Sequence, residues 1–222
     1  MSIRSVTGQR ATRSANRPVY LAAFRRYVHE LISLGHARLD PMAHSTSEEP
    51  VITGELIRMM RTVIESPGAP AWAVYFTVHD DPPVNAPRRY GKRRQRVDIE
   101  FERTQPGPHP RFQFEAKRLR DASSIDDYLG KDGLGCFTEA QYARDRDEAG
   151  MLGYLQAGEA ESWAVQIRAN LKQNARKYRL RSDGAWKQCP VAQSLEHTYR
   201  TRHNRSKPFG PIAIDHILIR FF

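Results

Sequence analysis

Two neighbouring segments of the chain, residues 95–103 and 111–119, alternate strictly between apolar and polar side chains. The apolar members are Val97, Ile99 and Phe101 in the first segment and Phe112, Phe114 and Ala116 in the second. A period of two is typical of a β-strand with one face in a core, because successive side chains point to opposite faces. A short connection rich in proline joins the segments, so the pattern predicts two strands paired as a hairpin.

Apolar residues at helical spacing, together with breaks at glycine and proline, predict the remaining elements. Helices are expected at about 18–35, 50–65, 136–146 and 160–180, and further strands at 71–79, 150–157 and 212–222. Residues 150–157 also fit a continuation of the preceding helix, but Gly150 and Gly153 favour a strand. The mixture predicts an α/β fold, in which 18–222 form a single domain and the polar, basic residues 1–17 form a mobile tail.

Composition excludes several classes of protein. With 222 residues, of which 40% are hydrophobic, the chain can form a core and is not fully disordered. No apolar run approaches the roughly 18–20 residues of a membrane helix. The N-terminus lacks the apolar stretch of a secretory signal, and Cys136 and Cys189 form neither a disulfide framework nor a zinc cluster, so a cytoplasmic protein is expected. The net charge of +10 favours an anionic partner, most often nucleic acid.

The polar faces of the two alternating strands bring together two carboxylates and an ammonium. Glu115 and Lys117 are two residues apart and share one face, and a hairpin places Asp98 across from them. Two carboxylates suit a hard cation such as Mg²⁺ or Mn²⁺, which polarises a phosphate and activates a bound water. Lys117 would hold or help deprotonate that water, or offset charge developing on phosphorus. The pattern therefore predicts metal-assisted phosphodiester cleavage.

Asp98 followed by Glu115-Ala116-Lys117 resembles the motif of the PD-(D/E)xK nuclease superfamily, which includes many type II restriction enzymes and Holliday-junction resolvases. The resemblance implies a restriction endonuclease-like core of helix, three-stranded meander, helix and strand, with a mixed sheet flanked by helices. Residues 50–157 show that order, with an added N-terminal helix and C-terminal strand. The chain departs from the family pattern at Val97, where proline is common, and in the longer loop after the Asp98 strand.

The resemblance also implies a third metal ligand, because many members of the superfamily add a glutamate from the first core helix. Glu55 is the residue expected there. Glu55 borders the apolar face of its helix, where an acid needs a charged partner. A metal ion and the side chain of Arg58 explain its position equally well. Glu48 and Glu49 precede Pro50 and are expected to be ordinary charges at a helix N-terminus.

Several of these residues have plainer interpretations. Asp98 also fits a solvated strand residue, with Glu100 as a rival on the same face, and the Glu115–Lys117 pair also fits a surface ion pair. Gln113 shares the face of that pair and is expected near the site. Residues expected to be structural or exposed rather than catalytic are Gln141, Tyr142, His197, His203 and His216.

Basic side chains gather in three stretches of the sequence. The expected nucleic-acid contacts are Arg88, Arg89, Lys92, Arg93 and Arg94 before the Asp98 strand, and Arg168, Lys172, Arg176 and Lys177 on the late helix. A third stretch follows at 200–207. Tyr90, Tyr178 and Trp186 lie among these charges and are expected to stack on bases. A solvated surface explains any one stretch more easily than all three together.

These observations predict a Mg²⁺-dependent endonuclease acting on nucleic acid, with DNA as the expected substrate and restriction or anti-phage defence as the expected setting. Because one metal site cuts one strand, a homodimer or an assembly with partner subunits is compatible with this chemistry. The alternative is a non-catalytic nucleic-acid-binding module, or a subunit of a larger DNA-processing complex. A third interpretation is a basic protein that docks an acidic partner.

Overall fold

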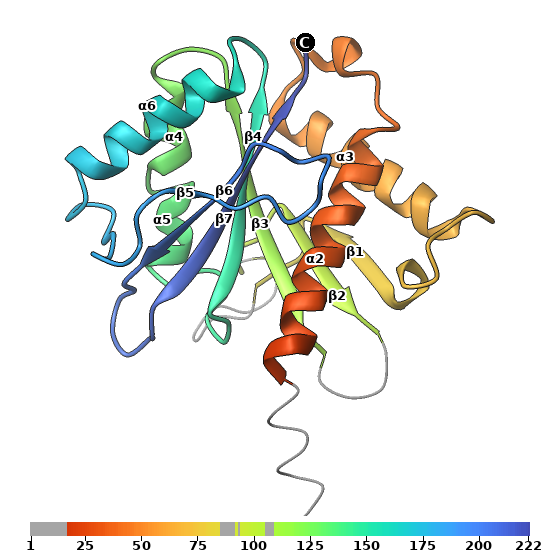
Figure 1. The fold of residues 1–222 in the computed structure, drawn as a ribbon, viewed down its shortest axis with the longest axis horizontal. Helices are drawn as coiled ribbons and strands as arrows, with labels where there is room; N and C mark the ends of the chain where they lie inside the picture. The colour runs from red at the N-terminus through yellow and green to blue at the C-terminus, as the bar shows by residue number, and fades with distance from the viewer. Residues whose placement is uncertain (1–16, 85–91, 93, 105–108) are drawn as a thin grey trace, which may run out of the picture.

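The computed structural model describes residues 17–84, 92, 94–104 and 109–222, and the described residues form a seven-stranded mixed sheet (Figure 1). The order of the strands across the sheet is β1-β2-β3-β4-β7-β6-β5. The strands are β1 (Phe76–Asp80), β2 (Ile99–Arg103), β3 (Arg111–Leu119), β4 (Glu148–Leu155), β5 (Lys187–Gln188), β6 (Thr198–His203) and β7 (Ile212–Arg220). The sheet is open rather than closed into a barrel, with β1 and β5 at its two edges. Helices and a mixed sheet together make this an α/β protein.

The expected hairpin is confirmed. β2 pairs antiparallel with β3, with Ile99 opposite Phe114 and Phe101 opposite Phe112, and β1 pairs antiparallel with β2. β4 then runs parallel to β3, and β7 runs parallel to β4. Parallel neighbours need long crossover connections, and helices follow β3 and β4 in the chain for that reason.

Helices cover both faces of the sheet (Figure 1). The helices are α2 (Arg17–His36), α3 (Glu49–Glu65), α4 (Ser124–Leu129), α5 (Leu134–Thr138) and α6 (Ala160–Gln173). The first two pack on what we call the α3 face, against Phe114 and Leu152, and the last three pack on the α6 face, against Leu119 and Met151. Because β4 and β7 are enclosed on both faces, they are almost wholly buried.

A buried aspartate fastens α2 to the sheet. Asp215 on β7 accepts hydrogen bonds from Arg25 Nη2 at 2.8 Å and Arg200 Nη1 at 2.7 Å, and His29 Nε2 lies 3.0 Å from its other oxygen. Burial opposes the charged form, but the hydrogen bonds from His29 and Arg25 outweigh it and hold the pKa of Asp215 well below its usual range. Arg25 and His29 belong to α2, so these hydrogen bonds hold α2 against β7. Loss of Arg25 would leave the charge of Asp215 buried with fewer partners, which is destabilising.

Some expected boundaries are wrong. The helix expected over 136–146 ends at Thr138, and residues after it form turns in which Ala140 and Ala143 have positive φ angles of 52° and 48°. The helix expected over 160–180 ends at Gln173, and β5 and β6 lie in a basic region for which no strand was expected.

Among the described residues, no helix is long and apolar enough to cross a membrane.

The strand expected over 95–103 starts only at Ile99. The chain bends at Asp98, so Val97 packs into the core on the α6 face, whereas Ile99 and Phe101 pack on the α3 face. The alternation that placed Val97 with Ile99 is therefore wrong by one residue at this bend. The displacement matters because it gives Asp98 its position.

Candidate active site

Glu115 and Lys117 project from β3 toward the α6 face of the sheet. The intervening residues of β3, Phe114 and Ala116, pack in the core on the α3 face, so the expected alternation of this strand is confirmed. Glu115 is buried and Lys117 is half-buried. Both side chains therefore lie inside the protein rather than on a solvated surface, which disfavours the interpretation as a surface ion pair.

Asp98 lies at the bend directly before β2. The register pairs Ile99 with Phe114, and the next residue outward on each strand is Asp98 and Glu115. Asp98 Oδ2 accepts a hydrogen bond from the backbone N–H of Ala116 at 2.7 Å. The Asp98 carboxylate thus accepts from a backbone N–H of β3, as a main-chain carbonyl of a paired strand would. This hydrogen bond holds Asp98 Oδ2 beside the backbone between Glu115 and Lys117.

Lys117 binds three oxygens. Its Nζ donates to Glu115 Oε1 at 2.9 Å, to Glu49 Oε1 at 3.0 Å and to the carbonyl oxygen of Ala116 at 2.7 Å. Glu49 is the first residue of α3, so the N-terminus of that helix reaches the end of β3. We refer to Asp98, Glu115, Lys117 and Glu49 as the carboxylate–lysine cluster.

The carboxylates of the cluster share a buried, negative environment. Burial and the nearby charge of Asp98 raise the pKa of Glu115 to about 8. Burial raises the pKa of Asp98 to about 6, against the opposing effects of the Ala116 hydrogen bond and of Lys117. Burial also opposes charge on Lys117, but the charges of Glu115 and Glu49 outweigh it and raise the pKa of the ammonium above its usual value. Lys117 is therefore a cation that stays protonated near neutral pH.

One buried oxygen of the cluster lacks a partner among the described residues. Glu115 Oε2 makes no hydrogen bond to any of them, which is costly for a carboxylate. A hard cation beside Glu115 and Asp98 would satisfy that oxygen, and Mg²⁺ is commonly held by one or two carboxylates with water and phosphate completing its shell. The described residues contain no group of three His, Cys, Asp or Glu side chains placed to hold a metal. Asp98 and Glu115 are the two carboxylates that could hold such an ion, with water completing its shell.

Of the acids on α3, the structure pairs Glu55 with Arg58 and brings Glu49 into contact with Lys117. Glu55 pairs with Arg58, with 2.7 Å between Oε2 and Nη2, and this contact lowers the pKa of Glu55. Glu49, expected to be only a helix-terminal charge, contacts Lys117. Glu48 lies at the N-cap as expected and pairs with Arg118. No spacing rule indicates Glu49, because its contact depends on how α3 crosses the sheet.

Gln113 and Glu100 form a separate link on the same sheet. Gln113 Nε2 donates to Glu100 Oε2 at 2.6 Å, and Gln113 Oε1 accepts from the backbone N–H of Ala143 at 2.7 Å. These bonds tie the hairpin to the turns before β4. The structure thus gives Gln113 and Glu100 structural partners and places Asp98, rather than Glu100, beside Ala116.

Tyr142 borders the cluster. Its hydroxyl donates to the carbonyl oxygen of Arg96 at 2.5 Å, and its side chain is buried as expected. Burial raises the pKa of Tyr142, and the charge of Glu115 adds to that effect. Tyr142 therefore supports the backbone that leads into Asp98.

The expected nucleic-acid contacts are only partly described. Arg88, Arg89, Arg93 and Tyr90 lie outside the described residues. The others are Lys92, Arg168, Lys172, Arg176 and Lys177, which are exposed, and Arg94, which is half-buried. Arg168 and Lys172 lie on α6, which packs on the face that carries Glu115 and Lys117.

The prediction that Tyr178 and Trp186 stack on bases finds no support. Tyr178 is buried, and its hydroxyl donates to Asn170 Oδ1 at 3.0 Å. Trp186 stacks on Tyr199, with 4.7 Å between ring centroids. His203 and His216 are buried and structural, as expected, and His197 Nε2 lies 3.6 Å from Glu161 Oε1.

Comparisons with protein-family models, with curated proteins and with solved structures find no match to this chain.

Proposed function

We propose that this chain is a metal-dependent endonuclease with a restriction endonuclease-like fold, and that it hydrolyses phosphodiester bonds of DNA. The observation that carries the proposal is the convergence of Asp98, Glu115 and Lys117 at one point of the sheet. The order of elements from α3 through the meander to β4 supports it, because the resemblance to the PD-(D/E)xK superfamily implies that order. Restriction or anti-phage defence is the setting that we propose.

The chemistry assigned to each residue follows from its contacts. Asp98 and Glu115 would hold Mg²⁺ or Mn²⁺, which when bound polarises the scissile phosphate and lowers the pKa of a bound water. Asp98 is fixed for this task by the Ala116 N–H, and Glu115 offers its unpartnered Oε2. The role of third carboxylate passes from Glu55 to Glu49, because Glu49 contacts Lys117.

Lys117 supplies a fixed positive charge. Its raised pKa keeps it protonated, so it suits donation to a phosphate oxygen or to an attacking water better than removal of a proton. The ammonium already neutralises Glu115 and Glu49, which keeps the carboxylates together before any cation arrives. Exposed basic residues on and after α6, with Lys92, would contact phosphates on either side of the cut.

Cleavage of supercoiled plasmid DNA tests the proposal. The full chain should nick or cut in Mg²⁺ and Mn²⁺ and should stop in EDTA. Asp98→Asn, Glu115→Gln and Lys117→Met, purified identically, should each lose about 10²-fold or more in rate. Glu65→Gln, which changes an exposed carboxylate at the other end of α3, is the matched control and should cut at the wild-type rate. Cutting at the wild-type rate by all three cluster variants would reject the proposal.

One observation favours a second function. Lys117 engages both Glu115 and Glu49, so the cluster also fits a structural ion network inside a non-catalytic nucleic-acid-binding module. That function predicts salt-sensitive binding that is equal in EDTA and in Mg²⁺, with no cleavage. If RNA rather than DNA is cut in the same assay, the reaction stands and only the choice of substrate changes.

A further inference from the structure

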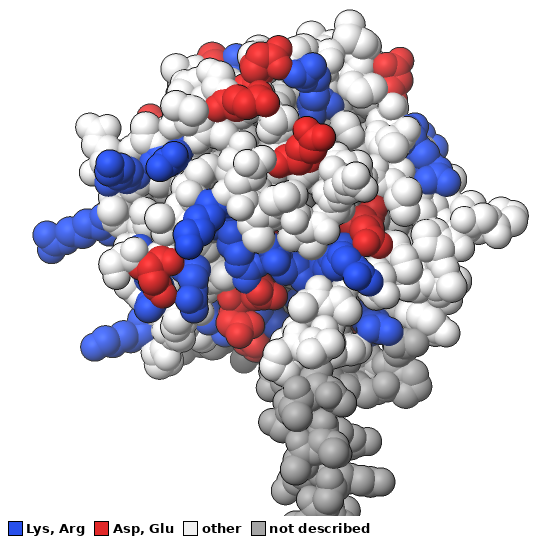
Figure 2. Space-filling model, viewed as in Figure 1, with Lys and Arg blue, Asp and Glu red and all other residues white. Residues whose placement is uncertain are grey.

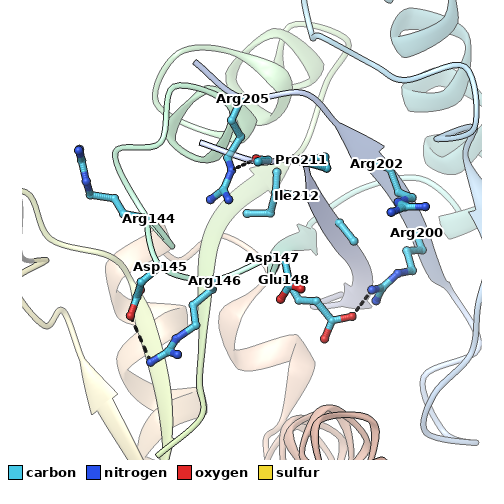
Figure 3. A pocket seen from close by; sticks show the side chains of 12 residues that line it. Arg144, Asp145, Arg146, Asp147, Glu148, Arg200, Arg202, Arg205, Pro211 and Ile212 are labelled. Atoms are coloured by element: carbon cyan, nitrogen blue, oxygen red, sulfur yellow. Dashed lines mark hydrogen bonds and ion pairs between the residues drawn. The ribbon is translucent and has the colours of Figure 1, made fainter. Parts of the chain in front are cut away.

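A second charged feature lies away from the carboxylate–lysine cluster. A hollow of about 710 Å³ opens where β4 and β7 begin and β6 ends (Figure 3). We call it the arginine hollow. Its lining residues are Arg144, Asp145, Arg146, Asp147, Glu148, Arg200, Arg202, Arg205, Gly210, Pro211, Ile212 and Ala213. On the side of the molecule where α2 crosses the sheet, Figure 2 shows Lys and Arg side chains gathered over β5, β6 and β7.

The arginine hollow lies at the end of the sheet where β4 and β7 begin, and only part of its lining is on the face opposite the cluster. Ala149 and Ile214 pack in the core on the α6 face, so their neighbours Glu148 and Asp215 project toward α2. Gly150 pairs with Phe114 and Gly153 with Lys117, so Glu148 lies five residues below Lys117 along the parallel strands. Glu115 pairs with Met151, three residues from Glu148. At about 3.3 Å per residue, Glu148 is therefore roughly 10 Å from Glu115 and roughly 16 Å from Lys117 along the strands.

Most of the carboxylates in the hollow are already neutralised. Glu148 pairs with Arg200, and Asp145 Oδ2 lies 3.4 Å from Arg146 Nη2. Asp147 is the remaining acid of the lining. Figure 3 shows Asp147 and Glu148 between Arg205 on one side of the hollow and Arg200 and Arg202 on the other.

Among the residues that the structure describes, two arginines of the lining donate hydrogen bonds only to backbone carbonyls. Arg205 donates from Nε to the Gly210 oxygen at 2.6 Å and from Nη1 to the Ala143 oxygen at 2.8 Å. Arg144 donates from Nη1 to the Ala140 oxygen at 3.1 Å. Both guanidinium groups lie over the ring of Phe209, at 4.6 Å for Arg144 and 5.7 Å for Arg205.

These contacts hold two charges in place without neutralising them. Within the described residues, neither Arg144 nor Arg205 forms an ion pair with a carboxylate. Burial lowers the pKa of Arg205, with partial compensation from the charges of Asp147 and Asp145. A guanidinium that is oriented, partly desolvated and unpaired is suited to bidentate recognition of a phosphate.

We propose that the arginine hollow is a phosphate-binding site that takes a segment of nucleic-acid backbone away from the scissile bond. Arg205 and Arg144 supply charges on one side that have no carboxylate partner among the described residues. On the other side, Arg202 supplies an exposed guanidinium whose Nη1 lies 3.2 Å from Asp183 Oδ2. The choice of nucleic acid as the source of the phosphate rests on the proposed function, whereas the phosphate site itself rests on the hollow. Because the hollow is remote from the cluster, it contributes to binding and not to the chemical step.

The test measures binding of a fluorescein-labelled oligonucleotide, single-stranded and duplex, to the full chain in EDTA by anisotropy at several salt concentrations. Arg144→Gln/Arg205→Gln should bind about tenfold or more weakly. The slope of log affinity against log salt should shrink by about 1.8 for the duplex and about 1.4 for the single strand, because each lost contact removes about 0.9 or about 0.7, respectively. Arg38→Gln/Arg58→Gln removes two exposed arginines elsewhere and should change neither quantity by a comparable amount. Equal behaviour of the two double variants would overturn the proposal.

Two further measurements keep the proposal falsifiable. Arg202→Gln alters an exposed side chain of the same hollow and should weaken binding even if the double variant fails to fold. Titration with inorganic phosphate and with AMP distinguishes sources: if these bind at the hollow but the oligonucleotide does not, the nucleic-acid assignment is overturned.

Cleavage kinetics in Mg²⁺ separate this proposal from the proposed function. The arginine variants should raise KM and leave kcat within about twofold. If the wild-type chain cuts and these variants keep its KM, the hollow is not a substrate contact although the nuclease proposal stands. If the wild-type chain does not cut but the variants lose oligonucleotide binding, the hollow stands and the nuclease proposal fails.

Discussion

Glu49 Oε1 lies 3.0 Å from Lys117 Nζ, although Glu49 begins a helix and Lys117 stands near the end of a strand in the middle of the sheet. The same ammonium lies 2.9 Å from Glu115 Oε1. One positive charge therefore serves two carboxylates from different elements. The metal ion that we propose would have to share Glu115 with Lys117, so the lysine would both hold the carboxylates together and compete with the cation.

Lys117→Met should bind Mn²⁺ more tightly than the wild-type chain while losing cleavage. An ammonium about 4 Å from a divalent ion costs about 2 kcal/mol even at the dielectric constant of water, so its removal should give roughly a 30-fold gain in affinity. Isothermal titration with Mn²⁺ measures the affinity, and plasmid cleavage measures the loss. Lys187→Met, an exposed residue of β5, is the control. Unchanged or weaker Mn²⁺ binding by Lys117→Met would contradict the competition.

Glu49→Gln should lower kcat/KM more than Glu55→Gln, by about tenfold or more. The reason is that Glu49 shares Lys117 with Glu115, whereas Glu55 is engaged by Arg58 on the surface of α3. Both substitutions remove one carboxylate from the same helix, so each serves as the control for the other. The opposite ranking would return the third-carboxylate role to Glu55.

Glu115→Gln should raise stability at high pH and lose that advantage in acid. In the folded chain the pKa of Glu115 is raised from 4.5 to about 8, so the folded state binds the proton more tightly than the unfolded state. Above pH 8 the wild-type chain carries a disfavoured buried charge, and below pH 4.5 it carries none. Urea unfolding at pH 5, 7 and 9 should show the variant's advantage growing with pH. A difference that does not change with pH would contradict the raised pKa.

Local periodicity in the sequence predicts the strands whose two faces meet different surroundings. The alternation of residues 111–119 predicts β3 with its faces correctly assigned, because both faces of that strand meet well-defined environments. The glycine at position 150 was also correctly read as a strand residue, and the ring of Phe114 lies where a side chain at 150 would project. The phase of β3 places Glu115 and Lys117 on one face, whereas the position of Asp98 depends on the bend before β2.

The features that sequence patterns missed depend on long-range packing. The partner of Lys117 from α3 is Glu49, and only the crossing of the helix over the sheet selects it from the acids of that helix. The strand β6 was hidden because its basic side chains read as a solvated run, whereas its alternate residues Thr201 and His203 are buried against the sheet. The arginine hollow joins turns before β4 to residues after β6, which no local pattern connects.

Thr201 joins two buried histidines whose protonation should oppose folding. Its hydroxyl Oγ1 lies 2.7 Å from His203 Nε2 and 2.8 Å from His216 Nε2, and the Tyr128 hydroxyl lies 3.0 Å from His216 Nδ1. Burial lowers the pKa of His203 from 6.5 to about 4 and that of His216 to about 3. Below pH 6.5 the unfolded chain takes up these protons and the folded chain does not, so the histidines favour unfolding as the pH falls.

The carboxyls of Asp98 and Glu115 act in the opposite direction over part of this range, so the measurement must compare variants. His203→Gln should be destabilising at pH 7.5, because it breaks a buried network, and its cost relative to wild type should shrink by roughly 2–3 kcal/mol by pH 4. Urea unfolding at several pH values measures this difference. His109→Gln changes an exposed histidine and should give a small, pH-independent difference. A cost of His203→Gln that stays constant from pH 7.5 to pH 4 would show that His203 is not held neutral in the folded protein.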